Sequence, residues 1–360
     1  MIVTDRFLAS IVFVLKGAIG QSPVIRRVWC AFFYWPLRER IDMREYVLRR
    51  LLLLIPTVIG VTLIVFMMMR LIPGDPITNM MGEMYSEEDA QRLRQELGLD
   101  QPLVLQYAKW LLFLLRGDWG SSILTHQTVL ADILYTLPVS LELIVLAMII
   151  SLVIAIPAGV IAAVWPNSWK DYSAMVASMA GVSIPEFFLG VLLFLLFALV
   201  LGWLPVAGYV SPREDLWQNL RHMLLPAVTL GFPRAALLTR LIRASLLEVL
   251  RLEYVTTARS KGLKERFVVL KHALKNALIP TLTVIGLQIG FLIGGAIVVE
   301  TVFAVPGIGS FGINAIVQRD YPQVQAFVLV AALVFVIANL TVDMLYAVVD
   351  PRIQYGKEEA

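Results

Sequence analysis

The 360-residue sequence has little cysteine, little histidine and little charge. Its one cysteine, Cys30, has no partner for an internal disulfide, and the three histidines, His126, His222 and His272, are far apart in the chain. The patterns His-Glu-x-x-His, Gly-x-Ser-x-Gly and Gly-x-x-x-x-Gly-Lys-[Ser/Thr] are all absent. These absences argue against redox chemistry, a metal site or a catalytic site, and any ATP hydrolysis must take place in another protein.

Only 16% of the residues are charged and 59% are hydrophobic, whereas soluble globular chains carry about 25% charged residues. This composition predicts an all-α protein that crosses a membrane several times. The formal net charge of +3 is small and unevenly distributed, so it bears on orientation in the membrane and argues against nucleic acid as a partner.

Six stretches are long and apolar enough to cross the hydrocarbon core, which takes about 20 residues of helix. The third contains Pro185 and Glu186, which allow a kink or a break, and we predict one helix there. The six predicted spans are residues 46–70, 138–164, 172–204, 224–247, 278–303 and 324–349.

The distribution of Lys and Arg predicts the orientation, since these residues collect in short cytoplasmic loops. They precede the first span, lie between spans two and three and between four and five, and follow the sixth. Residues 71–137 instead hold nine acidic and four basic residues, and they contain a helix start at 86–89 and an amphipathic stretch at 97–107. We therefore expect both termini and the tail, residues 351–360, in the cytoplasm and an extracytoplasmic lobe at 71–137.

Residues 1–42 mix aromatic and basic side chains, a combination that suits the headgroup layer of a bilayer. We expect an interfacial or flexible extension here. A signal peptide or an additional span remains an alternative, and Met43 is an alternative start of the protein.

The segment from Glu253 to Pro280 is basic although it lies between two apolar spans. One apolar face at helical spacing runs through Leu247, Leu250, Tyr254 and Ala258 to a helix end at Gly262, and a second runs through Phe267, Leu270, Leu274 and Ala277. A solvated charged loop is the alternative. Two apolar stripes without a core of their own favour a helix, a turn and a helix that contact something else.

The segment 253–263, Glu-Tyr-Val-Thr-Thr-Ala-Arg-Ser-Lys-Gly-Leu, with His-Ala-Leu-Lys-Asn-Ala-Leu-Ile-Pro at 272–280, resembles the coupling loop of ABC importer permeases, specifically the B-type subunit of the dipeptide, oligopeptide and nickel branch. The resemblance covers nearly all of residues 43–355. Further matching motifs are Pro73-Gly74-Asp75-Pro76, residues 97–102, Gly117-Asp118-Trp119-Gly120, residues 183–187, Pro306-Gly307-Ile308-Gly309, Arg319-Asp320-Tyr321 and residues 343–355.

This resemblance implies a type I importer permease fold with six transmembrane helices, a core at 138–350 and a cytoplasmic coupling loop at 248–280. The loop has Thr-Thr-Ala at 256–258 where the broader permease pattern has Glu-Ala-Ala, and its spacing from Gly262 to Pro280 is longer. Both departures suit the peptide and nickel branch and put contacts borrowed from sugar permeases in doubt. The expected coupling residues are Glu253, Tyr254, Thr257, Ala258, Arg259, Lys261, Gly262 and Pro280.

The implied partners are two ATPase subunits or domains that bind ATP and Mg, a second homologous permease, an extracytoplasmic substrate-binding protein and the lipid bilayer. This chain would carry no cofactor and no catalytic residue, and it would lie in a bacterial or archaeal cytoplasmic membrane. Its cargo would be a peptide or a related small solute, nickel chelates included.

Polar residues inside the spans are expensive in lipid, so they are candidates for a translocation pathway. We name Glu186, Gln288, Asn339 and Asp343, each of which has pairing or bonding between helices as its alternative. Glu142, about a turn inside the second predicted span, is expected to be structural. The turn at Pro306, Gly307 and Gly309 is a candidate external gate or docking surface.

Two other classes compete with this interpretation. A secondary transporter or channel explains the spans but leaves the basic helix pair without a purpose, and the inverted repeats typical of such transporters are not evident. A membrane enzyme needs a clustered catalytic constellation, which the sequence lacks.

Overall fold

The structure is a computed structural model that describes residues 43–71 and 100–349. The chain divides into two units, residues 1–49 with 351–360 and residues 50–350. Of the first unit only the start of one helix, residues 43–49, is described. The expectations for residues 1–42, for the helix start at 86–89 and for the tail lie outside the described residues.

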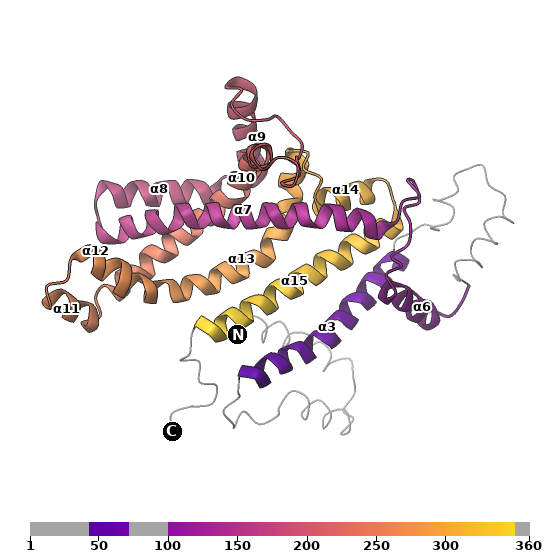
Figure 1. Cartoon of the computed structure of the whole chain (residues 1–360), viewed down its shortest axis with the longest axis horizontal. Coiled ribbons are helices and arrows are strands. Elements are labelled where there is room, and N and C mark those ends of the chain that lie inside the picture. The colour runs from indigo at the N-terminus through magenta and orange to yellow at the C-terminus, as the bar shows by residue number, and fades with distance from the viewer. Residues whose placement is uncertain (1–42, 72–99, 350–360) are drawn as a thin grey trace. The chain divides into compact units, whose positions relative to one another are not determined.

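The described part of the second unit is built of helices, with one isolated antiparallel bridge between Ser121 and Thr128. Figure 1 shows the helices in chain order. They are α3 (Met43–Leu71), α6 (Leu103–Leu115), α7 (Val129–Val164), α8 (Trp169–Ser183), α9 (Glu186–Leu193), the π-helix η2 (Phe194–Val200), α10 (Leu216–Val249), α11 (Glu253–Ser260), α12 (Glu265–Phe267), the π-helix η3 (Val268–Ala273), α13 (Leu274–Val302), α14 (Ile308–Val317) and α15 (Tyr321–Val349).

Five helical stretches within the described residues are long and apolar enough to cross a membrane, and a bent pair of helices makes a sixth. This confirms the predicted multi-pass helical fold. The stretches are Leu51–Met68, Val129–Val164, Leu216–Val249, Glu265–Leu292 and Tyr321–Thr341, and the bent pair is Trp169–Ser183 with Glu186–Val200.

The third predicted span is not one helix. The chain bends by 106° between α8 and α9. Ile184 leaves the helical region, with φ −80° and ψ 124°, because a residue before proline is driven towards extended backbone, and Pro185 has no N–H to continue the ladder. The prediction of a single helix over 172–204 is therefore wrong, and the break places Glu186 in the first turn of α9.

Two spans begin earlier than the hydropathy pattern predicts. Helix α7 starts at Val129 and passes through Pro138, so its first turns lie within the region predicted as the lobe, 71–137. Helix α10 starts at Leu216, where the Asp215 carboxylate accepts hydrogen bonds from the N–H groups of Trp217 and Gln218. Prolines are tolerated inside membrane helices, so Pro138 does not mark a boundary.

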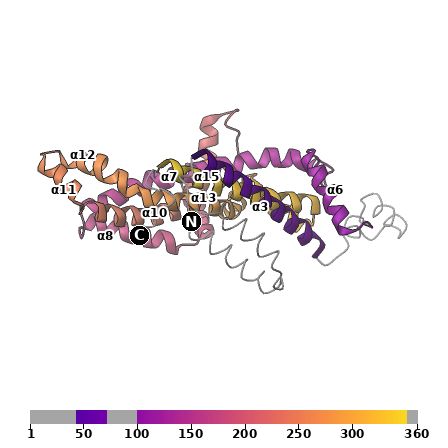
Figure 2. The same ribbon diagram turned by 90° about the horizontal axis from the view of Figure 1, so that it is seen from below.

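Helix α10 lies against α7, α8, α9 and α13 and is the centre of the packing. Figures 1 and 2 both show α7 and α10 running together. Gly231 lets the two backbones approach closely, since a Cβ there would lie 2.5 Å from the Ala147 carbonyl oxygen. Around it, Leu143, Leu230 and Leu292 are fully buried in one apolar cluster.

The described end of the lobe is tied to two spans. Tyr107 of α6 shares a 2.8 Å hydrogen bond with Thr62 of α3. Ser122, in the loop before α7, donates to the buried Asp320 carboxylate at 2.5 Å, and Asp320 lies immediately before α15. Of the predicted amphipathic stretch at 97–107 the structure describes residues 100–107, and α6 begins within it at Leu103.

Candidate functional site

The basic segment folds as helix, turn and helix, as the sequence predicts. Helix α11 ends at Ser260, and Gly262 adopts a left-handed conformation with φ +75°. No atom lies within 4 Å of a Cβ placed on Gly262, so its backbone conformation and not crowding calls for glycine. Figures 1 and 2 both show α11 and α12 at the end of the molecule where α7 ends and α8 begins.

The first predicted helix is in fact two helices. Helix α10 ends at Val249 and α11 starts at Glu253, with Leu252 in extended backbone, φ −73° and ψ 147°. Because of this break, the buried face of α11 does not continue the buried face of α10. The buried residues of α11 are Val255 and Ala258, whereas Tyr254, which we expected on the buried face, is 40% exposed.

Helix α11 is mounted on the ends of the spans through a small apolar cluster. Val255 is fully buried and Ala258 nearly so. The other buried members come from three directions: Ala163 at the end of α7, Leu246 at the end of α10, and Val268, Val269, Ala273 and Ala277 on η3 and α13. Helix α11 therefore shares one apolar cluster with the ends of α7 and α10 and with η3 and α13.

The second predicted helix also differs in its buried face. A π-helical stretch, Val268–Ala273, shifts the register, so Phe267 and Leu270 are exposed and Val268, Val269 and Ala273 are buried. Pro280 does not close the segment either. It is exposed inside α13, because a membrane helix accepts a proline at the cost of one backbone hydrogen bond. The segment is thus continuous with the fifth span.

Two polar contacts also stabilise the segment from α11 to α13. The Asn276 amide donates to the Tyr254 hydroxyl at 2.8 Å, which joins α11 to α13. Across the Gly262 turn, Arg259 donates to Glu265 at 2.7 Å, and both side chains remain exposed. Arg259, one of the expected coupling residues, thus already has an ion pair within the chain.

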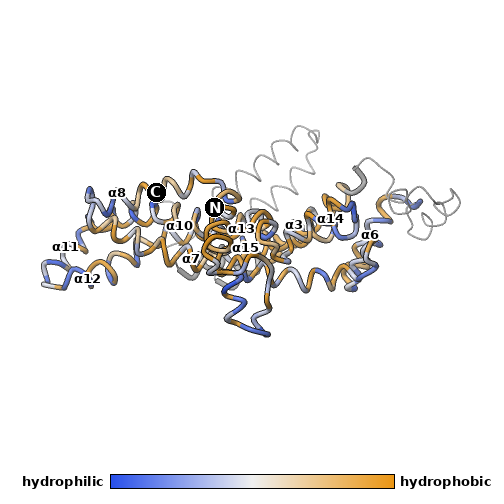
Figure 3. The backbone as a smooth tube through the Cα atoms, turned by 90° about the horizontal axis from the view of Figure 1, so that it is seen from above, coloured by the Kyte–Doolittle hydropathy of each residue, from blue (hydrophilic) through white to orange (hydrophobic). Residues whose placement is uncertain are grey.

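The outer side of α11 is polar and accessible. Glu253, Thr257, Arg259 and Lys261 are exposed. Figure 3 shows hydrophilic stretches in α11 and α12, whereas the central parts of α13 and α15 are hydrophobic. Nearby, the exposed Phe267 ring carries the Lys271 ammonium 4.7 Å from its centroid. Charged groups and one aromatic ring on a rigid mount can bind another protein.

Among the polar residues inside the spans, Glu186 has a partner that the sequence did not reveal. Its Oε1 accepts a hydrogen bond from Arg234 Nη1 at 2.6 Å, and the same nitrogen donates to the Leu230 carbonyl at 2.7 Å. The Glu186 side chain is 29% exposed and that of Arg234 12%. The predicted alternative, a paired carboxylate, is what the structure shows.

The other three pathway candidates are not brought together with Glu186 by any described contact. Both amide atoms of Gln288 are buried on α13 without a hydrogen-bond partner, as is the Thr281 hydroxyl. Asn339 is partly exposed on α15. Asp343 lies on the same helix, and its side chain is outside the described residues.

A fully buried carboxylate that the sequence analysis missed organises the turn at Pro306, Gly307 and Gly309. Glu300 accepts hydrogen bonds from Ser140 Oγ of α7 at 2.5 Å and from the Ser310 N–H at 2.9 Å. The Ser140 hydroxyl in turn accepts the Ile308 N–H at 2.7 Å. Gly307 and Gly309 are buried against this carboxylate.

Glu142, which we expected to be structural, is hydrogen-bonded within the protein. It lies well inside α7 and accepts a 2.8 Å hydrogen bond from the Tyr209 hydroxyl in the loop before α10. Burial raises the pKa of the Tyr209 phenol well above its usual range, and the hydrogen bond to the Glu142 carboxylate raises it further. The phenol therefore stays protonated and holds the loop to α7 at physiological pH.

A second interhelical ion pair was also missed. Arg243 of α10 donates two hydrogen bonds of 2.6 Å to the buried Asp171 at the start of α8. Asp171 also accepts the Asn167 N–H at 3.0 Å, so it fixes the corner between α7 and α8 to α10. This corner lies at the same end of the bundle as α11 (Figure 1).

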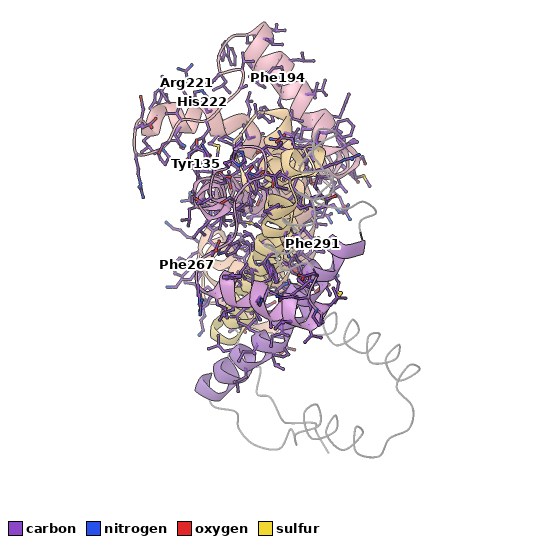
Figure 4. The ribbon with its side chains drawn as sticks, turned by 90° about the vertical axis from the view of Figure 1, so that its right-hand side faces the viewer. Tyr135, Phe194, Arg221, His222, Phe267 and Phe291 are labelled. Carbon is purple, nitrogen blue, oxygen red and sulfur yellow. The ribbon has the colours of Figure 1, made fainter. Side chains whose placement is uncertain are left out.

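The histidines do not gather. Nδ1 of His222, beside Arg221 on α10, is 2.7 Å from the Gln218 carbonyl oxygen of the same helix. The ring of His272 packs edge-on against Phe267, 5.6 Å between centroids. Figure 4 shows His222 and Phe267 far apart. Among the described residues, no group of three or more His, Cys, Asp and Glu side chains is placed to hold a metal ion.

Two protein-family models match the chain over most of its length. Residues 155–355 match the binding-protein-dependent transport system inner membrane component, and residues 43–144 match the N-terminal part of the membrane component of such systems. Both matches lie within the part of the sequence that carries the motif resemblance.

Curated relatives cover the chain to a similar extent. The dipeptide transport system permease protein DppB of Alkalihalophilus pseudofirmus is 42% identical over 87% of this chain and 100% of the relative. The glutathione transport system permease protein GsiC of Escherichia coli K12 is 43% identical over the same shares.

Among solved structures, a chain of the MetNI methionine ABC transporter, in an inward-facing conformation, matches 61% of this chain and 96% of its own length, with 19% identity and a TM-score of 0.49. The two family matches and the identity to curated permeases are much stronger than this likeness. On their strength, the chain belongs to the family of binding-protein-dependent transport system inner-membrane components, as a multi-pass permease of the peptide branch of ABC importers.

Proposed function

We propose that residues 253–264 of this permease dock on a separate ATPase subunit and carry its movement to the spans. The observation that supports this most is the apolar cluster under α11, in which Val255 and Ala258 are buried together with residues of α7, α10, η3 and α13. A short polar helix fixed to the ends of three spans acts as a lever. A solvated loop would not transmit force in this way.

The mechanism follows from that mount. ATP and Mg bound by two ATPase subunits or domains close them together, and α11 moves with the groove in which it lies. Because α7, α10 and α13 share the cluster with α11, their ends move with it. The pathway between this permease and a second homologous permease then opens alternately to the two sides. This chain binds no cofactor and catalyses no reaction in the cycle.

The docking contacts fall on the exposed residues. Arg259, already held by Glu265, presents the remainder of its guanidinium, and Lys261 and Thr257 lie beside it. We assign Tyr254 a bracing role, since its hydroxyl bonds to Asn276, and Gly262 the role of turning the chain. Acidic groups on the ATPase are the matching chemistry.

The charge distribution supports a cytoplasmic position for residues 253–275 and for both termini, and an extracytoplasmic position for the loop before α7. An extracytoplasmic binding protein then delivers the cargo to the side on which α14 lies. Glu186, Gln288, Asn339 and Asp343 remain our candidates for the pathway. The turn at Pro306, Gly307 and Gly309 remains our candidate for the external gate.

The proposed cargo is a peptide. Two of the relatives are named as permeases for dipeptides and for glutathione, both of which are peptides with free ammonium and carboxylate groups. The sequence motifs also suit the oligopeptide and nickel members of the branch. The experiment below decides among these cargoes by direct uptake.

The test is to assemble the chain with its candidate ATPase, second permease and binding protein in proteoliposomes. ATP-dependent, vanadate-sensitive uptake of radiolabelled L-alanyl-L-alanine or of glutathione is expected. Uptake without any ATPase subunit would instead establish the alternative, a secondary transporter or channel. A complex that takes up only a nickel chelate would contradict the peptide assignment.

Charge variants test the docking surface in the same preparation. Arg259→Glu is expected to reduce capture of the ATPase at least about tenfold, which corresponds to 1.4 kcal/mol. The double variant Arg259→Glu with Glu265→Arg restores an ion pair across the turn but not the positive charge at 259, so capture should stay low. Lys109→Glu, an equal charge change on α6, is the control. Normal capture by both Arg259 variants would refute the docking surface.

A further inference from the structure

The corner between α7 and α8 lies at the level where the hydrocarbon core ends. The last 22 residues of α7, 143–164, contain no charged residue and no histidine. At about 1.5 Å per residue they span about 33 Å, which matches a hydrocarbon core of about 30 Å. Residues 165–168 then link α7 to α8, which begins the bent pair that makes the sixth candidate span. This short link between two membrane helices therefore lies in the headgroup layer.

Large apolar side chains are exposed at this corner and along α8. Trp165 is 49% exposed, Trp169 75% and Tyr172 61%. Tryptophan and tyrosine are enriched at membrane interfaces, because one part of the side chain is apolar and the other forms hydrogen bonds. Further along α8, Val176 and Met179 are exposed as well. The exposed residues of α8 recur at spacings of three and four, so they form one stripe that runs from the corner towards the hydrocarbon.

The corner also carries a positive charge that has no acidic partner among the described contacts. The ammonium group of Lys170, which is partly exposed, lies 4.1 Å from the centroid of the Trp165 ring. The neighbouring acid, Asp171, is buried and accepts two hydrogen bonds from Arg243, so its charge is already paired. A cation held among interfacial aromatic rings attracts anionic headgroups.

We propose that the α7–α8 corner and the exposed stripe of α8 bind an anionic phospholipid. The phosphate group pairs with Lys170, the aromatic rings lie beside the glycerol backbone, and an acyl chain follows Val176 and Met179. About 15 Å of helix separates Trp169 from Met179, which is about the depth of one leaflet. The lipid belongs to the leaflet at the end of the molecule that holds α11.

A phospholipid fits this surface better than the ATPase that we propose for α11. The proposed docking residues lie on α11, and Figures 1 and 2 both show α8 on another side of the same end. The stripe continues for about 15 Å from the corner into the membrane, where a water-soluble protein does not reach. One cation in line with an apolar stripe is the complement of one phosphate in line with an acyl chain.

The first experiment compares two lipids on the purified full chain. Native mass spectrometry measures the binding of palmitoyl-oleoyl-phosphatidylglycerol and of palmitoyl-oleoyl-phosphatidylcholine, whose acyl chains are identical. The anionic lipid is expected to bind at least about fivefold more tightly, a difference of about 1 kcal/mol for one cation near the membrane surface. Equal binding of the two lipids would overturn the proposal. Displacement of phosphatidylglycerol by inorganic phosphate would overturn it too, since the site would then bind phosphate without a lipid.

Variants separate the headgroup contact from the apolar stripe. Lys170→Gln should remove the preference for phosphatidylglycerol and leave the binding of phosphatidylcholine unchanged. Val176→Ser together with Met179→Ser should weaken both lipids equally. Arg213→Gln, which removes an exposed cation before the start of α10, is the matched control and should keep the preference. A preference that survives Lys170→Gln, or that Arg213→Gln lowers as much, would refute the site.

A photocrosslinker then identifies the occupant of the stripe in the assembled complex. Val176 is exposed, so p-benzoylphenylalanine can replace it without a change in packing. Illumination of membranes that contain the complex should give an adduct with the mass of one phospholipid. A crosslink to the second permease or to the ATPase would show that protein covers the stripe and would overturn the proposal. Neither experiment depends on the cargo, so the lipid site can fail while the importer assignment stands.

Discussion

Glu300 shows how a single carboxylate can hold three elements together inside a membrane protein. It has no cationic partner among the described contacts, and its carboxyl oxygens accept hydrogen bonds from a hydroxyl of α7 and a backbone N–H at the start of α14. A helix N-terminus favours a negative group, since its first N–H groups lack partners in the helix. Glu300 therefore acts on α14 as a capping residue supplied by α13.

We expect Glu300→Gln to lower the free energy of unfolding by about 2 kcal/mol, because an amide NH₂ group would face N–H and O–H donors at a fully buried site. The apparent melting temperature of the purified chain in nanodiscs checks this. Glu248→Gln, at an exposed position, is the matched control. Equal melting temperatures for the two variants would contradict the capping role.

Partners of this kind cannot be predicted from one sequence. Glu186 stands out because it is a charge in an apolar run, but its partner Arg234 is 48 residues away on another helix. Asp171 and Arg243 are 72 residues apart. Hydropathy shows that such charges need partners, and only the packing of α8, α9 and α10 determines which ones they find.

At the scale of elements, the sequence predicts that an amphipathic helix is present better than it predicts which residues of that helix are buried. The order of the spans and the turn at Gly262, two residues after the end of α11, agree with the sequence pattern, because apolar length and a glycine after a helical stripe are local signals. The extended Leu252 and the π-helical turn Val268–Ala273 are not local signals. The extended residue and the π-helical turn place Val255, Val268 and Ala273 in the apolar cluster at the ends of the spans. Tertiary packing therefore selects these two local conformations.

Gly262 gives a prediction for the turn between α11 and α12. Gly262→Val should strain the turn by about 1–2 kcal/mol, because a residue with a Cβ pays a steric penalty at positive φ. Gly262→Asn should have a smaller effect, since asparagine tolerates this conformation better. Trypsin cuts after Lys261 and Lys264, both exposed, so its cleavage rate in inside-out membrane vesicles reports the opening of the turn.

The order of cleavage rates is the decisive observation. Gly262→Val should be cut fastest, then Gly262→Asn, then the unaltered chain. Because open space surrounds Gly262, crowding cannot produce this order. Equal rates for the valine and asparagine variants would show that the positive φ does not limit the stability of the turn. Lys109→Glu, on α6, should leave cleavage at 261 and 264 unchanged.

At the scale of the whole molecule, the long helices connect two ends that have different chemistry. One end holds the α11 cluster and the Asp171–Arg243 pair, and the other holds Glu300 with the turn before α14. Helices α7 and α13 reach both ends. Their number and apolar lengths follow from composition, so the fold class could be predicted. Which helices lie side by side is determined by the packing around α10 and could not be predicted from composition.

In the proposed function, docking uses the exposed face of α11 and transmission uses its buried face, and Val255 tests this separation. Val255→Ala removes two buried methyl groups between α11 and the spans and should cost about 2 kcal/mol of local stability. The exposed face of α11 is unchanged, so capture of the ATPase should remain normal. Peptide taken up per ATP hydrolysed should fall, because part of the movement of α11 is lost when its packing against the spans is looser.

Arg259→Glu should show the opposite pattern, with weak capture but normal uptake per ATP in the complexes that form. If Val255→Ala lowers capture and leaves the ratio of uptake to hydrolysis unchanged, the apolar cluster serves binding and does not transmit force.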